Sequence, residues 1–169
     1  STSPNYQMLA SLDVGRRQVQ FEGYELVEKS IELAMVLRAK INDHPKLKKY
    51  FDVLTISNFI PQQHRKSGIK EYYNSNDGWN RMEAAWEQDE FVLDPTKITL
   101  HIGRTGVDGD TFKNKYLMDK FNIQINKTSR NTVLFMTNIG TTRGSVTYLT
   151  NALLKIADEL DEAFKTLSE

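Results

Sequence analysis

The final third of the chain repeats apolar residues at helical spacing, and this pattern constrains the fold most strongly. Between residues 142 and 167 they recur three or four positions apart, the period of one helix face, at Val146, Leu149, Leu153, Ile156, Leu160 and Phe164. Thr141 or Thr142 is the expected N-cap. A second stretch, residues 22–42, has the same spacing. Two long amphipathic helices need another layer against which to bury their apolar faces.

Shorter segments predict that layer as a sheet. Alternating or β-branched residues favour strands over 51–56, 98–102, 123–125 and 132–139. Further helices are expected over 5–18, 79–88 and 111–121, with a polar loop over 58–80 in which 69–73 could form a short helix. The order of these elements predicts an α+β fold, in which helices cover one face of a small, mostly antiparallel sheet.

The dipeptide His44-Pro45 predicts the end of the helix over 22–42, because proline disfavours helix in the residue before it. We take it as the boundary between two units, residues 1–45 and residues 46–169.

Charge and cysteine content limit the classes of partner. Lys and Arg number 22 and balance 22 Asp and Glu, which removes the electrostatic reason to expect nucleic acid or an anionic membrane. No apolar run approaches the roughly 20 residues that span a bilayer. The absence of cysteine excludes disulfides and thiolate metal sites and fits a cytoplasmic protein.

Generic motifs for chemistry do not point to a site. His44, His64 and His101 are scattered, without metal-ligand spacing, so no metal site is expected. The glycines at 103, 106 and 109 lack the strand-turn-helix spacing of a dinucleotide fingerprint and are interpreted as turn residues.

Five segments in order carry a family resemblance. They are Ser1-Thr2-Ser3-Pro4-x-Tyr6 with Leu9-Ala10-Ser11, Leu93-Asp94-Pro95-Thr96-Lys97-Ile98-Thr99-Leu100, Asp108-Gly109, Lys127-Thr128, and Leu134-Phe135 with Ile139-Gly140. Together they resemble the ornithine/lysine/arginine decarboxylases over nearly the whole chain.

The resemblance implies a fold-type-I lyase that uses pyridoxal 5'-phosphate (PLP) to decarboxylate arginine, lysine or ornithine. Residues 1–45 would be the end of the PLP-binding large domain with its linking helix, and residues 46–169 the C-terminal small domain that closes over the substrate. The implied partners are the rest of the PLP domain and a second subunit, as in a homo-oligomer such as a dimer. The family's Ser-x-His-Lys motif, which holds the cofactor, is absent here. We therefore expect a fragment that is inactive alone.

The resemblance also implies site residues. Ser1, Thr2 and Ser3 would contact the cofactor phosphate, although a Ser-Pro helix entry explains them equally well. Asp108 or Asp110 would meet the distal amine of a basic substrate, against the alternative of turn capping.

Arg130 departs from the family pattern. It would bind a substrate carboxylate, or it is a surface residue. A firmly held α-carboxylate suits transamination, so another fold-type-I enzyme such as an aminotransferase is one alternative function. A non-catalytic, stand-alone binding domain is the other.

Overall fold

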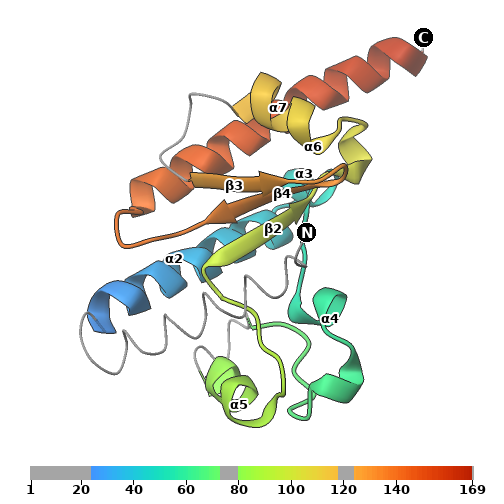
Figure 1. Ribbon diagram of the computed structural model, residues 1–169. Coiled ribbons are helices and arrows are strands. Elements are labelled where there is room, and N and C mark those ends of the chain that lie inside the picture. The colour runs from blue at the N-terminus through green and yellow to red at the C-terminus, as the bar shows by residue number, and fades with distance from the viewer. Residues whose placement is uncertain (1–23, 73–79, 118–123, 169) are drawn as a thin grey trace.

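The computed structural model describes residues 24–72, 80–117 and 124–168, and within them the fold is built on a four-stranded antiparallel sheet (Figure 1). The strand order β1-β2-β4-β3 leaves β1 and β3 at the edges. The strands are β1 (Asp52–Val53), β2 (Lys97–His101), β3 (Gln124–Thr128) and β4 (Thr132–Met136). Each neighbouring pair is antiparallel, which confirms the predicted α+β class.

Two long helices, α2 (Tyr24–Asp43) and α7 (Arg143–Ser168), lie against one face of this sheet (Figure 1). In β4, Val133 and Phe135 are fully buried while the residues between and beside them are partly exposed, because successive side chains of a strand point to opposite faces. The same core takes Leu33, Leu37 and Ile41 from α2 and Leu149, Leu153 and Ile156 from α7. The two apolar stripes of the sequence therefore meet on the sheet. None of the described helices is long and apolar enough to cross a membrane.

The start of α7 settles which threonine caps it. Thr142 Oγ1 accepts a hydrogen bond of 3.1 Å from the backbone N–H of Ser145, which is the N-cap geometry. Thr141 Oγ1 instead accepts from the N–H of Asn138 at 2.9 Å and closes the loop after β4. At its other end α7 extends past the sheet, so Phe164 and Leu167 are exposed (Figure 1).

The strand predicted over 132–139 ends at Met136, and the one predicted over 123–125 runs from Gln124 to Thr128. Three other segments differ more from the predicted elements. The strand expected over 51–56 ends at Val53, because Asn58 Oδ1 accepts from the N–H of Thr55 at 2.7 Å and opens the short helix α4 (Ile56–Phe59). No helix forms over Ile69–Tyr72. The helix expected over 111–121 is a turn of α-helix, α6 (Gly109–Thr111), followed by a π-helix, η3 (Phe112–Leu117).

Two further helices were predicted. The prediction over 79–88 is confirmed as α5 (Asn80–Gln88), whereas the helix predicted over 5–18 lies outside the described residues. The shorter helical segments are α3 (Pro45–Lys48) and two 3-10 turns, η1 (Gln62–His64) and η2 (Gly103–Thr105).

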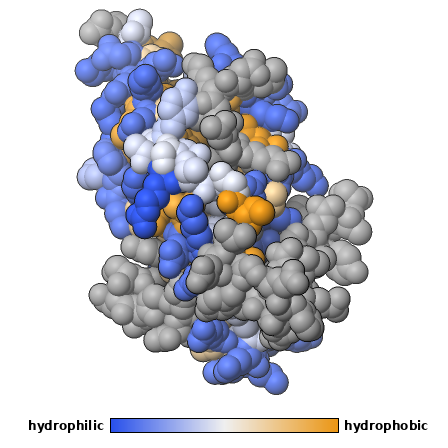
Figure 2. All heavy atoms as spheres, turned by 90° about the vertical axis from the view of Figure 1, so that its left-hand side faces the viewer, coloured by the Kyte–Doolittle hydropathy of each residue, from blue (hydrophilic) through white to orange (hydrophobic). Residues whose placement is uncertain are grey.

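A second, smaller core lies beside the first. Ile31 and Met35 of α2 pack with Ile56, Tyr72 and Met82, which come from the connection between β1 and β2. The helix α2 therefore contributes to two apolar clusters. On the side of the molecule seen in Figure 2, the described surface is mainly hydrophilic, with small separate apolar patches.

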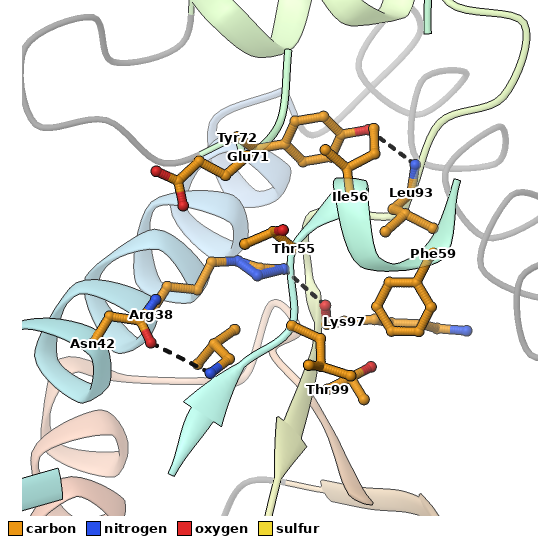
Figure 3. A pocket seen from close by; sticks show the side chains of 12 residues that line it. Arg38, Asn42, Thr55, Ile56, Phe59, Glu71, Tyr72, Leu93, Lys97 and Thr99 are labelled. Carbon is orange, nitrogen blue, oxygen red and sulfur yellow. Dashed lines mark hydrogen bonds between the residues drawn. The ribbon is translucent and has the colours of Figure 1, made fainter. Parts of the chain in front are cut away.

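Arg38 ties α2 to the sheet (Figure 3). Its Nη2 donates to the carbonyl oxygen of Lys97 at 2.8 Å and to that of Pro95 at 3.2 Å, where the chain enters β2. Burial lowers the pKa of Arg38 to about 10, while Tyr72 and Asp94 nearby favour its charge. One helical turn further along α2, the side-chain oxygen Oδ1 of Asn42 accepts a hydrogen bond of 3.3 Å from the N–H of Val53.

We expect Arg38→Met to destabilise the fold by about 1–3 kcal/mol, because it keeps an apolar stem but leaves the carbonyls of Pro95 and Lys97 without their donor. The free energy of unfolding in urea measures the effect. Glu32→Ala, at an exposed position on the same helix, is the control and should change stability by less than about 0.5 kcal/mol. Equal stability of the two variants would show that the Arg38 contacts do not hold α2.

Candidate functional site

Two loops are joined at one end of the sheet. The first follows β2 and runs from Ile102 to Thr111; the second is the turn of the β3–β4 hairpin. The N–H of Ile102 donates to the carbonyl of Asn131 at 2.8 Å, and the N–H of Gly109 donates to the carbonyl of Arg130 at 3.0 Å. We call these two loops the sheet-end loops.

The sheet-end loops approach each other closely at Gly109. It is buried, and a Cβ atom on it would lie 1.9 Å from the carbonyl oxygen of Ser129 and 2.8 Å from that of Thr132. Both distances are far below van der Waals contact, so a side chain fits only if the backbone moves. Gly106 has a different role: its φ of +76° ends η2, as expected of a turn glycine.

Asp108 caps the short helix α6. Its Oδ1 accepts from the N–H of Thr111 at 2.7 Å, and this bond is the main reason that the pKa of Asp108 lies below its ordinary value. The positive charge of Arg130 also lowers it. The turn-capping interpretation of Asp108 therefore has direct structural support.

Asp110 has a different environment. Its carboxylate is exposed, and Oδ1 accepts a hydrogen bond from Thr128 Oγ1 at the end of β3. Arg130 is exposed in the adjacent turn. The fold thus brings all three predicted substrate residues to the sheet-end loops, where the charge of Arg130 acts on the carboxylate of Asp108. Such a set can bind a cation through a carboxylate and a carboxylate through the arginine.

Thr128 carried no predicted role at this site, and Gly109 was predicted only as a turn residue. Thr128 and Gly109 both stand in motifs of the family resemblance, but their contacts join segments about 20 residues apart and leave no local pattern. The predicted cofactor residues Ser1, Thr2 and Ser3 lie outside the described residues.

The pocket beside Arg38 and Tyr72 is too small to hold PLP. The cavity beside Arg38 and Tyr72 has a volume of about 30 Å³, roughly that of one water molecule, whereas ligand pockets start at about 300 Å³ (Figure 3). Two larger hollows along α7 are open to solvent. In the first of them, a hydrogen bond to Asp161 raises the pKa of Lys49, which opposes the neutral amine that a Schiff base requires. Neither this small cavity nor Lys49 is therefore suited to hold the cofactor.

We expect Gly109→Ala to cost about 1–3 kcal/mol of stability, because the added methyl group must push the two loops apart. Gly144→Ala in the first turn of α7 is the matched control. Its Cβ would meet only Thr142 Oγ1, at 3.6 Å, and alanine favours helix, so the change should be neutral or slightly stabilising. Thermal unfolding of both variants measures this difference. A Gly109→Ala protein as stable as the control would contradict the close approach.

Several known proteins are similar to this chain in sequence. Residues 1–145 match the family model described as Orn/Lys/Arg decarboxylase, major domain. An arginine decarboxylase of Bacillus anthracis is 26% identical over 169 residues, which is 100% of this chain and 27% of that protein. An arginine decarboxylase of Bacillus subtilis is 25% identical over 162 residues, 96% of this chain and 27% of that protein.

One solved structure has a similar fold. It is described as the structure of E. coli constitutive lysine decarboxylase, and it matches with a TM-score of 0.50 at 20% identity, covering 92% of this chain and 22% of that one. The chain thus spans about a quarter of the length of the relatives it matches. Because the family match extends over most of its residues, the chain belongs to the Orn/Lys/Arg decarboxylase family.

Proposed function

We propose that this chain forms the substrate-facing end of a basic amino-acid decarboxylase, with Asp110 as the contact for the distal cation of arginine, lysine or ornithine. The observation that carries the proposal is the gathering of Asp108, Asp110 and Arg130 at the sheet-end loops, which Gly109 holds together. The arginine decarboxylases among the relatives support a substrate with a distal positive charge.

We favour Asp110 over Asp108 as the substrate contact because the two carboxylates accept different hydrogen bonds. The Asp108 carboxylate accepts the N–H of Thr111 and keeps the start of α6 in place. The Asp110 carboxylate is exposed, and within the described part of the chain it accepts a hydrogen bond from Thr128 at Oδ1. A carboxylate has about four lone-pair sites, so one donor leaves room for an ammonium or guanidinium group. Arg130 stays a proposed contact for the substrate carboxylate.

The complete enzyme is proposed to use PLP, which supplies the electron sink for loss of the carboxyl group when it is bound. This chain's share is to bind and orient the substrate and to exclude water from it as the small domain closes. The two-unit division at residue 45 also stays a proposal. Since α2 buries Leu33 and Leu37 in the core with the sheet, the linking helix would move together with the small domain.

We propose a homo-oligomer, such as a dimer, in which residues 1–45 take part in subunit contacts. The alternative reaction, transamination, differs in its product: a decarboxylase releases CO2 and an amine, whereas an aminotransferase releases a 2-oxo acid. Product analysis on the complete enzyme separates the two.

In the complete enzyme, Asp110→Asn should lower kcat/KM for the basic substrate by about one to two decades, since a charge-assisted hydrogen bond is worth roughly 1.5–3 kcal/mol. The neutral analogue norleucine should be almost unaffected, because it never had this interaction. Asp108→Asn is the matched control and should reduce both rates alike through a weakened α6 cap. Equal losses for the two substrates in Asp110→Asn would reject the contact.

The 169-residue chain by itself should form no internal aldimine, that is, no stoichiometric Schiff base between PLP and one lysine, because the Ser-x-His-Lys motif is absent from it. The measurement is the absorbance of the mixture, followed by borohydride reduction and mapping of any labelled lysine. Scattered, substoichiometric labelling agrees with the expectation. Stoichiometric labelling of a single lysine contradicts it.

A further inference from the structure

Asp110 stands on an element that cannot orient a side chain unaided. The helix α6 comprises three residues, Gly109–Thr111, and Asp110 is exposed on it. An exposed carboxylate on a single turn is free to sample several rotamers, and fixing one of them costs conformational entropy. Any precise orientation of this carboxylate must therefore come from a neighbouring element.

Thr128 is that neighbour. Its Oγ1 donates a hydrogen bond to Asp110 Oδ1 across 18 positions of sequence. Thr128 is the last residue of β3 and pairs with Val133 of β4, so its backbone belongs to the sheet. The side chain is β-branched, which limits its rotamers further. A stiff donor on a strand thus meets a carboxylate on a short turn.

The backbone around this pair is held from both sides. The N–H of Ser129 donates to the carbonyl of Thr132 at 2.9 Å and closes the hairpin directly after Thr128. The N–H of Gly109 donates to the carbonyl of Arg130 at 3.0 Å directly before Asp110. The first bond fixes the shape of the hairpin turn, and the second ties that turn to the backbone beside Asp110. The hydroxyl of Thr128 then selects the rotamer of Asp110.

We infer that Thr128 is a positioning residue, which acts through Asp110 and turns that carboxylate toward the distal cation of the substrate. The inference rests on the proposed function of Asp110. By occupying Oδ1 with a neutral donor, Thr128 reduces the rotamer freedom that Asp110 would lose on binding the cation. Its contribution is therefore to substrate affinity and to the preference for charged over neutral substrates.

The test compares kcat and KM of the complete enzyme for its basic substrate and for norleucine. Thr128→Val keeps the β-branched shape and removes the hydroxyl. We expect kcat/KM for the basic substrate to fall about 3- to 10-fold, mainly through KM, with norleucine unchanged. Thr128→Ser retains the hydroxyl and should stay within about twofold of wild type. Thr128→Ala removes the hydroxyl by a second route and should repeat the loss of Thr128→Val.

The matched control is Thr132→Val on the facing strand. The hydroxyl of Thr132 also makes one side-chain hydrogen bond on this hairpin, but to Ser129 Oγ. The Thr132→Val variant should leave the ratio of kcat/KM for the basic substrate to kcat/KM for norleucine unchanged. Asp110→Asn combined with Thr128→Val should be no worse than Asp110→Asn alone, because the hydroxyl acts only through that carboxylate.

The outcomes separate the two claims. If Asp110→Asn is impaired but Thr128→Val matches wild type, the positioning role is wrong and the proposed function stands. If Thr132→Val shows the same selective loss as Thr128→Val, a loosened hairpin is the cause and the positioning role is again rejected. If Asp110→Asn has no selective effect, the proposed function fails and the role of Thr128 fails with it.

Discussion

The backbone contact between Gly109 and the β3–β4 turn holds the candidate site together. The N–H of Gly109 reaches the carbonyl of Arg130, and the carbonyl of Ser129 lies where a Cβ would stand. Without this contact, the loop after β2 would be joined to the hairpin by the bond from Ile102 to Asn131 and by the side-chain bond from Thr128 to Asp110. With it, Asp108, Asp110 and Arg130 are fixed beside one another although 20 positions of sequence separate Asp110 from Arg130.

The rest of the fold serves as a support for this end of the sheet. The strands β2 and β4, whose ends carry the sheet-end loops, are paired from Lys97 with Met136 to His101 with Thr132. Behind them α2 and α7 bury a shared apolar core, and Arg38 anchors α2 to the chain just before β2. The proposed substrate contact is therefore on a loop with a packed layer beneath it, which is the usual arrangement for binding loops.

The features that the sequence predicts well are those with a local cause. The apolar residues of 142–167 recur three or four positions apart and specify the helix α7. The residues of 132–139 alternate at every second position and specify the strand β4. The strand over 51–56 was predicted too long, since the capping interaction of Thr55 with Asn58 outweighs the β-propensity of Leu54 and Ile56. The π-helix was missed although Phe112 and Leu117, both buried, stand five positions apart. The role of Gly109 was not predictable, because it depends on a segment that is distant in the sequence.

The family resemblance named Asp108 and Asp110 together, and only their hydrogen bonds separate a capping residue from a candidate substrate contact. The most direct test of that distinction is a crystal structure of the complete enzyme with a non-reactive analogue of its basic substrate. The account predicts the distal nitrogen of the ligand within about 2.7–2.9 Å of an Asp110 carboxylate oxygen. A distal nitrogen that lies away from the sheet-end loops, bound by other residues, would contradict it.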